Sequence, residues 1–146
     1  MEINVEVDPD PNSNFVIIPH AIGRKLAGTT SYQVGNWVEV LAANFLIKKG
    51  LLRRHQNFRC RIGEIDLVMN HGRYLVFIEV RYRKQDSFGD AKASITPEKQ
   101  RKIRRSAEFY LQRFGYRPDR TYCRFDVIAG NSISEGIQLE WIKNAF

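Results

Sequence analysis

Residues 63–83 read GEIDLVMNHGRYLVFIEVRYR, and this stretch decides the fold. Its segments 65–69 and 74–80 are rich in β-branched and aromatic residues, which favours two strands buried in a core. The segment 70–73 between them, Asn-His-Gly-Arg, is typical of a tight turn. The stretch therefore predicts an antiparallel β-hairpin.

The hairpin carries one carboxylate in each strand, Asp66 and Glu79. A two-residue turn at 71–72 sets Asp66 opposite Phe77, whereas a turn at 72–73 sets it opposite Glu79. Because side chains alternate with a period of two, either register places both carboxylates on one face, and only a three-residue loop separates them. Like charges this close in an apolar hairpin require a positive group, either a divalent cation or a basic side chain.

Charge is distributed unevenly along the 146 residues of the chain. The net charge is +7, but residues 1–31 contribute −2, which leaves +9 for residues 32–146. A body this rich in arginine attracts polyanions and suits bidentate contacts with phosphate. We therefore expect a nucleic acid as the partner, and a basic protein without such a partner is the alternative.

Hydropathy, cysteine and histidine patterns exclude several other classes of protein. The chain has no apolar run long enough to cross a membrane and no start resembling a signal peptide, so we expect a cytoplasmic protein without a membrane partner. In that compartment Cys60 and Cys123 are expected to be reduced and buried. The three histidines lack the paired spacing of a zinc site and are interpreted as surface or loop residues.

The length of the chain suits one domain with a hydrophobic core. We assign this domain to residues 32–146. Residues 1–31 are interpreted as a partly flexible N-terminal extension, because this segment is polar and rich in turn-forming residues. Within the extension only residues 15–18 have the composition of a strand.

Two helices are predicted in the domain. Apolar residues recur at helical spacing over 33–49, and Gly50 supplies the stop. The second helix runs from Pro97 to about Phe114, with Thr96 as its N-cap. Together with the hairpin, strand-like segments at 53–61, 122–129 and 137–142 give the order helix, three strands, helix, two strands. This order predicts an α/β domain with a mixed central sheet flanked by helices.

These elements carry candidate catalytic side chains. Asp66 and Glu79 offer the oxygen ligands that Mg²⁺ or Mn²⁺ prefers, and such an ion promotes phosphodiester hydrolysis by polarising the phosphoryl oxygen. Glu39 lies beside the apolar stripe of the first helix, where it is either a further metal ligand or an ordinary solvated glutamate. Arg81 follows Glu79 by two residues and projects a fixed positive charge from the same face. The alternative without catalysis is a buried ion-pair network of these residues with Glu64.

Basic side chains gather on the second helix and around the hairpin. They are interpreted either as a phosphate-binding surface or as an ordinary solvated face. The residues that we assign to nucleic-acid binding are Arg59, Arg61, Arg83, Lys99, Lys102, Arg104 and Arg105.

Short motifs in this chain closely resemble the YraN family of endonuclease-like proteins. The resemblance extends from about Gly35 to the end of the chain, so the N-terminal extension lies outside it. The motifs are Asn57–Arg59, Gly63–Leu67, Val76–Arg81, Ser87–Gly89, Arg124–Val127 and Asn144–Phe146.

The resemblance implies a restriction-endonuclease-like fold, similar to Holliday-junction resolvases, with a variant of the PD-(D/E)xK motif. Glu39, Asp66 and Glu79 match the acidic positions of that motif. Arg81 falls on its lysine position, and because an arginine does not readily deprotonate water, this departure is expected to weaken catalysis. Restoring lysine at this position is expected to raise cleavage. A second departure is Val38, where the family usually has glycine.

The leading hypothesis is a Mg²⁺- or Mn²⁺-dependent endonuclease acting on branched or otherwise structured DNA. A homodimer fits this hypothesis, because a DNA junction has two scissile strands and a two-fold dimer has two active sites. One alternative is a non-catalytic nucleic-acid-binding module, and another is a component of a larger DNA repair or processing assembly.

Overall fold

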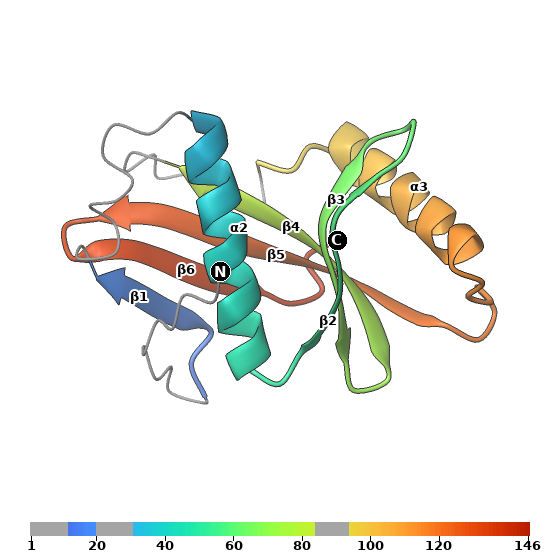
Figure 1. Cartoon of the computed structure of the whole chain (residues 1–146), viewed down its shortest axis with the longest axis horizontal. Helices are drawn as coiled ribbons and strands as arrows, with labels where there is room; N and C mark the ends of the chain where they lie inside the picture. The colour runs from blue at the N-terminus through green and yellow to red at the C-terminus, as the bar shows by residue number, and fades with distance from the viewer. Residues whose placement is uncertain (1–11, 20–30, 84–93) are drawn as a thin grey trace.

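The computed structural model describes residues 12–19, 31–83 and 94–146, with the side chains of residues 31–34 excepted. The Ser87–Gly89 motif lies outside these residues. The helices and strands (Figure 1) are β1 (Phe15–Pro19), α2 (Ser31–Lys48), β2 (Leu52–Arg59), β3 (Glu64–His71), β4 (Tyr74–Arg83), α3 (Pro97–Arg113), β5 (Tyr122–Ile133) and β6 (Gly136–Ile142).

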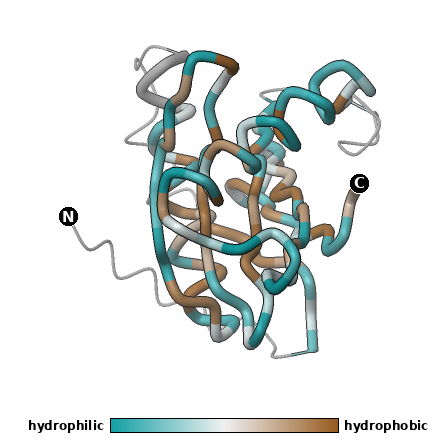
Figure 2. The backbone as a smooth tube through the Cα atoms, turned by 90° about the vertical axis from the view of Figure 1, so that its right-hand side faces the viewer, coloured by the Kyte–Doolittle hydropathy of each residue, from teal (hydrophilic) through white to brown (hydrophobic). Residues whose placement is uncertain are grey.

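The strands form one mixed sheet in the order β1-β6-β5-β4-β3-β2. β4 and β5 are parallel, and the other neighbouring strands of this sheet are antiparallel. α2 packs on one face and α3 on the other, since Val76 and Ile78 of β4 join the core under α2 while Leu75 and Phe77 join the core under α3. Apolar residues concentrate along the inner strands (Figure 2). The predicted fold class and element order are confirmed, and the arrangement is consistent with a restriction-endonuclease-like fold.

The hairpin of β3 and β4 turns at residues 72–73, which selects one of the two registers that the sequence leaves open. Pairing runs from His71 opposite Tyr74 to Leu67 opposite Ile78. Gly72 adopts φ +56, a positive angle that suits the first position of a tight hairpin turn. The same register sets Asp66 opposite Glu79. Beyond this point the strands diverge (Figure 1), and Val80 donates its backbone N–H to Asp66 Oδ2 at 2.8 Å.

β1 is an edge strand of the same sheet, pairing antiparallel with β6. Val16 and Ile18 are buried in the core under α2. The pairing is close, because a Cβ atom on Gly136 would lie 1.8 Å from the carbonyl oxygen of Ile18. Residues 15–19 therefore contribute to the fold, while the predicted domain boundary at residue 31 adjoins residues 20–30, which are outside the described part of the chain.

Histidines and cysteines differ in part from expectation. His55 and His71 lie in strands rather than in loops, and both are half-buried. His20 lies outside the described residues. Cys60 and Cys123 are free thiols, as expected, but both are half-buried rather than buried. No helix in the described ranges is long and apolar enough to span a membrane.

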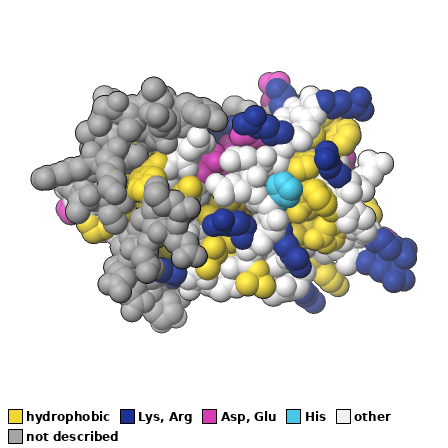
Figure 3. Space-filling model, in the orientation of Figure 1, with side chains coloured by type: hydrophobic (Ala, Val, Ile, Leu, Met, Phe, Trp, Pro, Cys, Tyr) yellow, Lys and Arg dark blue, Asp and Glu magenta, His cyan; other side chains and the backbone are white. Residues whose placement is uncertain are grey.

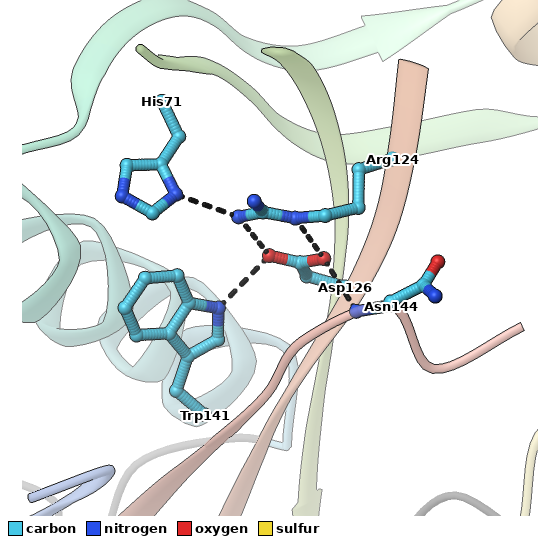
Figure 4. A network of polar contacts seen from close by, with 5 residues as sticks. All are labelled: His71, Arg124, Asp126, Trp141 and Asn144. Atoms are coloured by element: carbon cyan, nitrogen blue, oxygen red, sulfur yellow. Dashed lines mark hydrogen bonds and ion pairs between the residues drawn. The ribbon is translucent and has the colours of Figure 1, made fainter. Parts of the chain in front are cut away.

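A buried aspartate holds the C-terminal residues against β5 (Figure 4). Asp126 is fully buried and receives two hydrogen bonds from Arg124, each 2.9 Å long. It also accepts hydrogen bonds from Trp141 Nε1 and from the backbone N–H of Asn144, both at 2.9 Å. His71 Nδ1 lies 2.9 Å from Arg124. The carboxylate thus joins β5 to β6 and to the residues that follow β6.

Replacing Asp126 by alanine should destabilise the fold by about 3–5 kcal/mol, because Arg124 would keep a buried charge without its partner. Urea unfolding measures the free energy of the change. Asp119→Ala is the matched control, since Asp119 pairs with Arg117 at an exposed site and should contribute only about 0–1 kcal/mol. Equal losses in the two variants would contradict a structural role for the buried network.

Candidate active site

The candidate site lies where β3 and β4 separate. Asp66 of β3 and Glu79 of β4 are each only 7% exposed. Beside them is a cavity of about 470 Å³ between these strands and the N-terminal half of α3. Its wall includes Glu64, Asp66, Glu79, Lys99, Lys102 and Ser106. Residues of β3, of β4 and of the first turns of α3 therefore border one cavity.

Glu39 reaches the same place from the middle of α2. One carboxylate oxygen from each of Glu39, Glu64 and Asp66 lies within 4.8 Å of the others. Glu39 Oε2 is buried and accepts no hydrogen bond from the described residues. Glu64 joins this cluster, although it was predicted only as a member of the alternative ion-pair network. Oxygen donors at this spacing suit a hard divalent cation.

Burial and mutual repulsion raise the pKa values of two of these carboxyl groups. Burial is the main cause that raises the pKa of Asp66 to about 8, and the charges of Glu79 and Glu39 add to it, while the Val80 N–H opposes the shift. The pKa of Glu39 is also raised, mainly by burial, with the Glu64 charge second. Both groups hold a proton more readily than an exposed carboxyl group does.

Two basic side chains compensate Glu79. Lys99 Nζ lies 2.8 Å from Glu79 Oε1, and Arg81 Nε lies 3.5 Å from the same oxygen. Lys99 is directed here by the start of α3, where Thr96 Oγ1 accepts a hydrogen bond from the Lys99 backbone N–H at 3.2 Å. Arg81 was predicted from the sequence to lie beside Glu79, whereas Lys99 was predicted only as part of the basic surface. The predicted cap at Thr96 was the one signal for its position.

The other predicted nucleic-acid-binding residues lie in different surroundings. Lys102 lines the cavity, and Arg59 forms an ion pair with Glu64 at 3.4 Å. Arg61 lies over the ring of Phe109, and Arg104 lies 4.8 Å from the ring centre of Phe125, which gives both a packing role as well. Arg105 is exposed, and Arg83 is half-buried at the end of β4. Figure 3 shows acidic side chains of this region bordered directly by Lys and Arg.

Comparison with known proteins identifies relatives across most of the chain. Residues 38–129 match the family described as "Uncharacterised protein family UPF0102". A UPF0102 protein of Methylobacillus flagellatus is 47% identical over 115 residues, which cover 78% of this chain and 96% of the relative. UPF0102 proteins of Nitrosospira multiformis and Aeromonas hydrophila are each 48% identical over 77% of this chain, covering 91% and 83% of their own lengths. The chain therefore belongs to the UPF0102 family, which is the YraN family that its motifs indicate.

Proposed function

We propose that this protein is a metal-dependent DNA endonuclease that hydrolyses phosphodiester bonds in branched or otherwise structured DNA. One observation carries the proposal. Asp66 of β3 and Glu79 of β4 line one cavity that also receives Lys99, and Glu39 of α2 brings a carboxylate oxygen within 4.8 Å of Asp66. Convergence of buried like charges is unfavourable for folding, which favours a functional reason for it.

The donor set fits Mg²⁺ or Mn²⁺. Glu39, Glu64 and Asp66 present oxygen atoms within 4.8 Å of one another, and the buried Glu39 Oε2 has no donor from the described residues. A bound divalent ion would polarise a phosphoryl oxygen and lower the pKa of a coordinated water. Glu79 faces this cluster from β4, and its pairing with Lys99 keeps a positive charge at the cavity wall.

The basic residues of the site have separable roles in this proposal. Arg81 supplies a fixed positive charge, because its guanidinium stays protonated near neutral pH. Lys99 supplies an ammonium group beside Glu79, on the side of the cavity formed by α3, so it is placed to contact the phosphate that is cut. Neighbouring phosphates are assigned to Lys102, which lines the cavity, to Arg59 beside Glu64, and to the exposed Arg105. In this proposal Lys99 of α3 supplies the lysine ammonium group that the motif position, occupied by Arg81, lacks.

A non-catalytic nucleic-acid-binding module is the second candidate. Arg81 at the lysine position of the motif favours it, because arginine is a poor proton acceptor. Both candidates require the basic residues around the cavity, and only the first requires the carboxylates. Variants of the carboxylates therefore separate the two functions.

Asp66→Asn and Glu79→Gln should each weaken Mn²⁺ binding at least tenfold, as judged from the roughly 10–100-fold effect of losing even indirect metal contacts. Calorimetric titration measures the affinity, and labelled junction, flap, single-stranded and duplex DNA report cleavage with either metal. Asp119→Asn, at an exposed aspartate, is the control and should match the parent. If Asp66→Asn binds Mn²⁺ like the parent, the metal site is wrong. A parent that binds DNA but cuts no substrate supports the binding module.

Lys99→Met should lower single-turnover cleavage by roughly 10²-fold, the usual effect of removing one electrostatic contact to a transition state. Lys102→Met, on the next turn of α3, is the matched control and should affect DNA binding more than cleavage. Arg81→Lys provides the discriminating comparison. A large gain from it supports the sequence-based expectation of an impaired nuclease, whereas little change indicates that Lys99 already supplies the required charge.

The pH dependence of stability should reveal the buried Asp66. The folded protein keeps this carboxyl group protonated up to about pH 8, whereas the model value for an unperturbed aspartate is 3.8. The folded state therefore binds more protons between these pH values, and metal-free protein should lose stability as the pH rises through this interval. Asp66→Asn should remove much of this loss, so the variant gains stability relative to the parent at pH 8 but not at pH 4. Parallel thermal unfolding curves for both proteins at all pH values would contradict the burial effect.

A further inference from the structure

Asn57 has an unusual backbone conformation for a residue inside a strand. It adopts φ 53 within β2, and Asn144 with φ 51 is the other non-glycine residue with positive φ in the described ranges. Asparagine tolerates this left-handed region better than most residues do. Such conformations persist where the surrounding structure enforces them, and they concentrate at functional sites.

The register of β2 places Asn57 directly across from Asp66. Its neighbours Gln56 and Phe58 pair with Leu67 and Ile65, and Asn57 stands between these two pairs. The pair of Asn57 with Asp66 is itself missing from the ladder, as the left-handed backbone requires. The irregular residue of β2 therefore adjoins the central carboxylate of the candidate active site.

The side chain of Asn57 contacts a second carboxylate of that site. A hydrogen bond from Asn57 acts on the Glu39 carboxyl group and opposes the rise of its pKa. The carboxamide of Asn57 is a donor that carries no charge, so it can orient Glu39 without replacing a cation. Glu39 belongs to α2, and Asn57 thus connects that helix to the strand beside Asp66.

The same irregularity affects how α3 is anchored. His55 and Phe58 are three residues apart and would point to opposite faces of a regular strand. Both nevertheless pack on Tyr110 of α3, with ring centres 5.9 Å and 5.1 Å from it. The N-terminal turn of that helix carries Lys99 to Glu79. His55 and Phe58, on either side of Asn57 along the chain, thus both pack against α3.

We propose that Asn57 is a positioning residue, whose left-handed backbone and carboxamide hold the Glu39 carboxylate against Asp66 in the orientation needed to bind a divalent cation. This inference rests on the proposed function, because it assigns Asn57 a role in that metal site. It adds to the proposed function that the orientation of the ligand Glu39 depends on another residue, Asn57. A strand irregularity with a purely structural role is the competing explanation.

Asn57→Gly tests the proposal, with Asn144→Gly as the matched control. Glycine adopts positive φ freely, so both variants keep the backbone conformation and should unfold at or above the temperature of the parent. Asn57→Gly should weaken Mn²⁺ binding by roughly 10–100-fold, the effect typical of losing a residue that orients a ligand. Its kcat should fall while KM for DNA changes little. Asn144→Gly, whose backbone N–H bonds to Asp126 far along the sequence, should match the parent in metal binding and cleavage.

Asn57→Asp separates the donor from the shape of the side chain. Aspartate also tolerates positive φ, but its carboxylate cannot donate to Glu39, so kcat should fall as in Asn57→Gly, while its added negative charge should keep or strengthen the attraction for Mn²⁺. If Asn57→Gly binds Mn²⁺ as tightly as the parent, Asn57 does not position the site. A loss of stability without a change in metal affinity equally overturns the proposal, in favour of the structural explanation.

NMR of the side-chain amide groups tests the contact independently of catalysis. Glu39→Gln should shift the carboxamide resonances of Asn57 and leave those of Asn144 in place. Unchanged Asn57 resonances would overturn the positioning role even if the parent is an active nuclease. A parent that neither binds Mn²⁺ nor cuts DNA removes the proposed function, and the assignment of Asn57 to a metal site fails with it.

Discussion

Asp66 and Glu79 lie opposite each other where β3 and β4 separate, and both are almost completely removed from solvent. Two carboxylates in such surroundings are stable only if protons, basic side chains or a cation reduce their repulsion. A proton and a basic side chain reduce the repulsion in this structure. Burial is the main cause that raises the pKa of Asp66 to about 8, and Lys99 Nζ lies 2.8 Å from Glu79 Oε1. α2 contributes Glu39 to the same place, and α3 contributes Lys99.

Local sequence signals were sufficient for the elements themselves. The alternation of side chains in the hairpin predicted that Asp66 and Glu79 share a face, because the period of a strand does not depend on the rest of the fold. The cap at Thr96 predicted the start of α3, and the structure confirms it. The choice between the two hairpin registers was not available from composition, because Gly72 suits a turn at either position.

Contacts between distant elements were not predictable in the same way. Lys99 reads as one of several basic residues on a helix, and only the packing of α3 across the sheet directs it to Glu79. Glu64 enters the carboxylate cluster because Glu39 approaches from α2. Asn57 carries no local signal for positive φ, since asparagine is also common in ordinary loops and strand ends. In each case a tertiary contact, rather than a local preference, gives the residue its place in the site.

The two edges of the sheet are protected from self-association in different ways. At one edge, β2 exposes Arg53 and Arg54 and contains a register shift, and charge and irregularity both discourage pairing with another strand. At the other edge, β1 occupies the hydrogen-bonding positions of β6 and fits against Gly136. Detachment of this five-residue strand would leave β6 with an open ladder and the apolar surface that Val16 and Ile18 now cover. The resistance of the protein to aggregation thus depends on a short N-terminal segment, β1, that contributes no residue to the candidate active site.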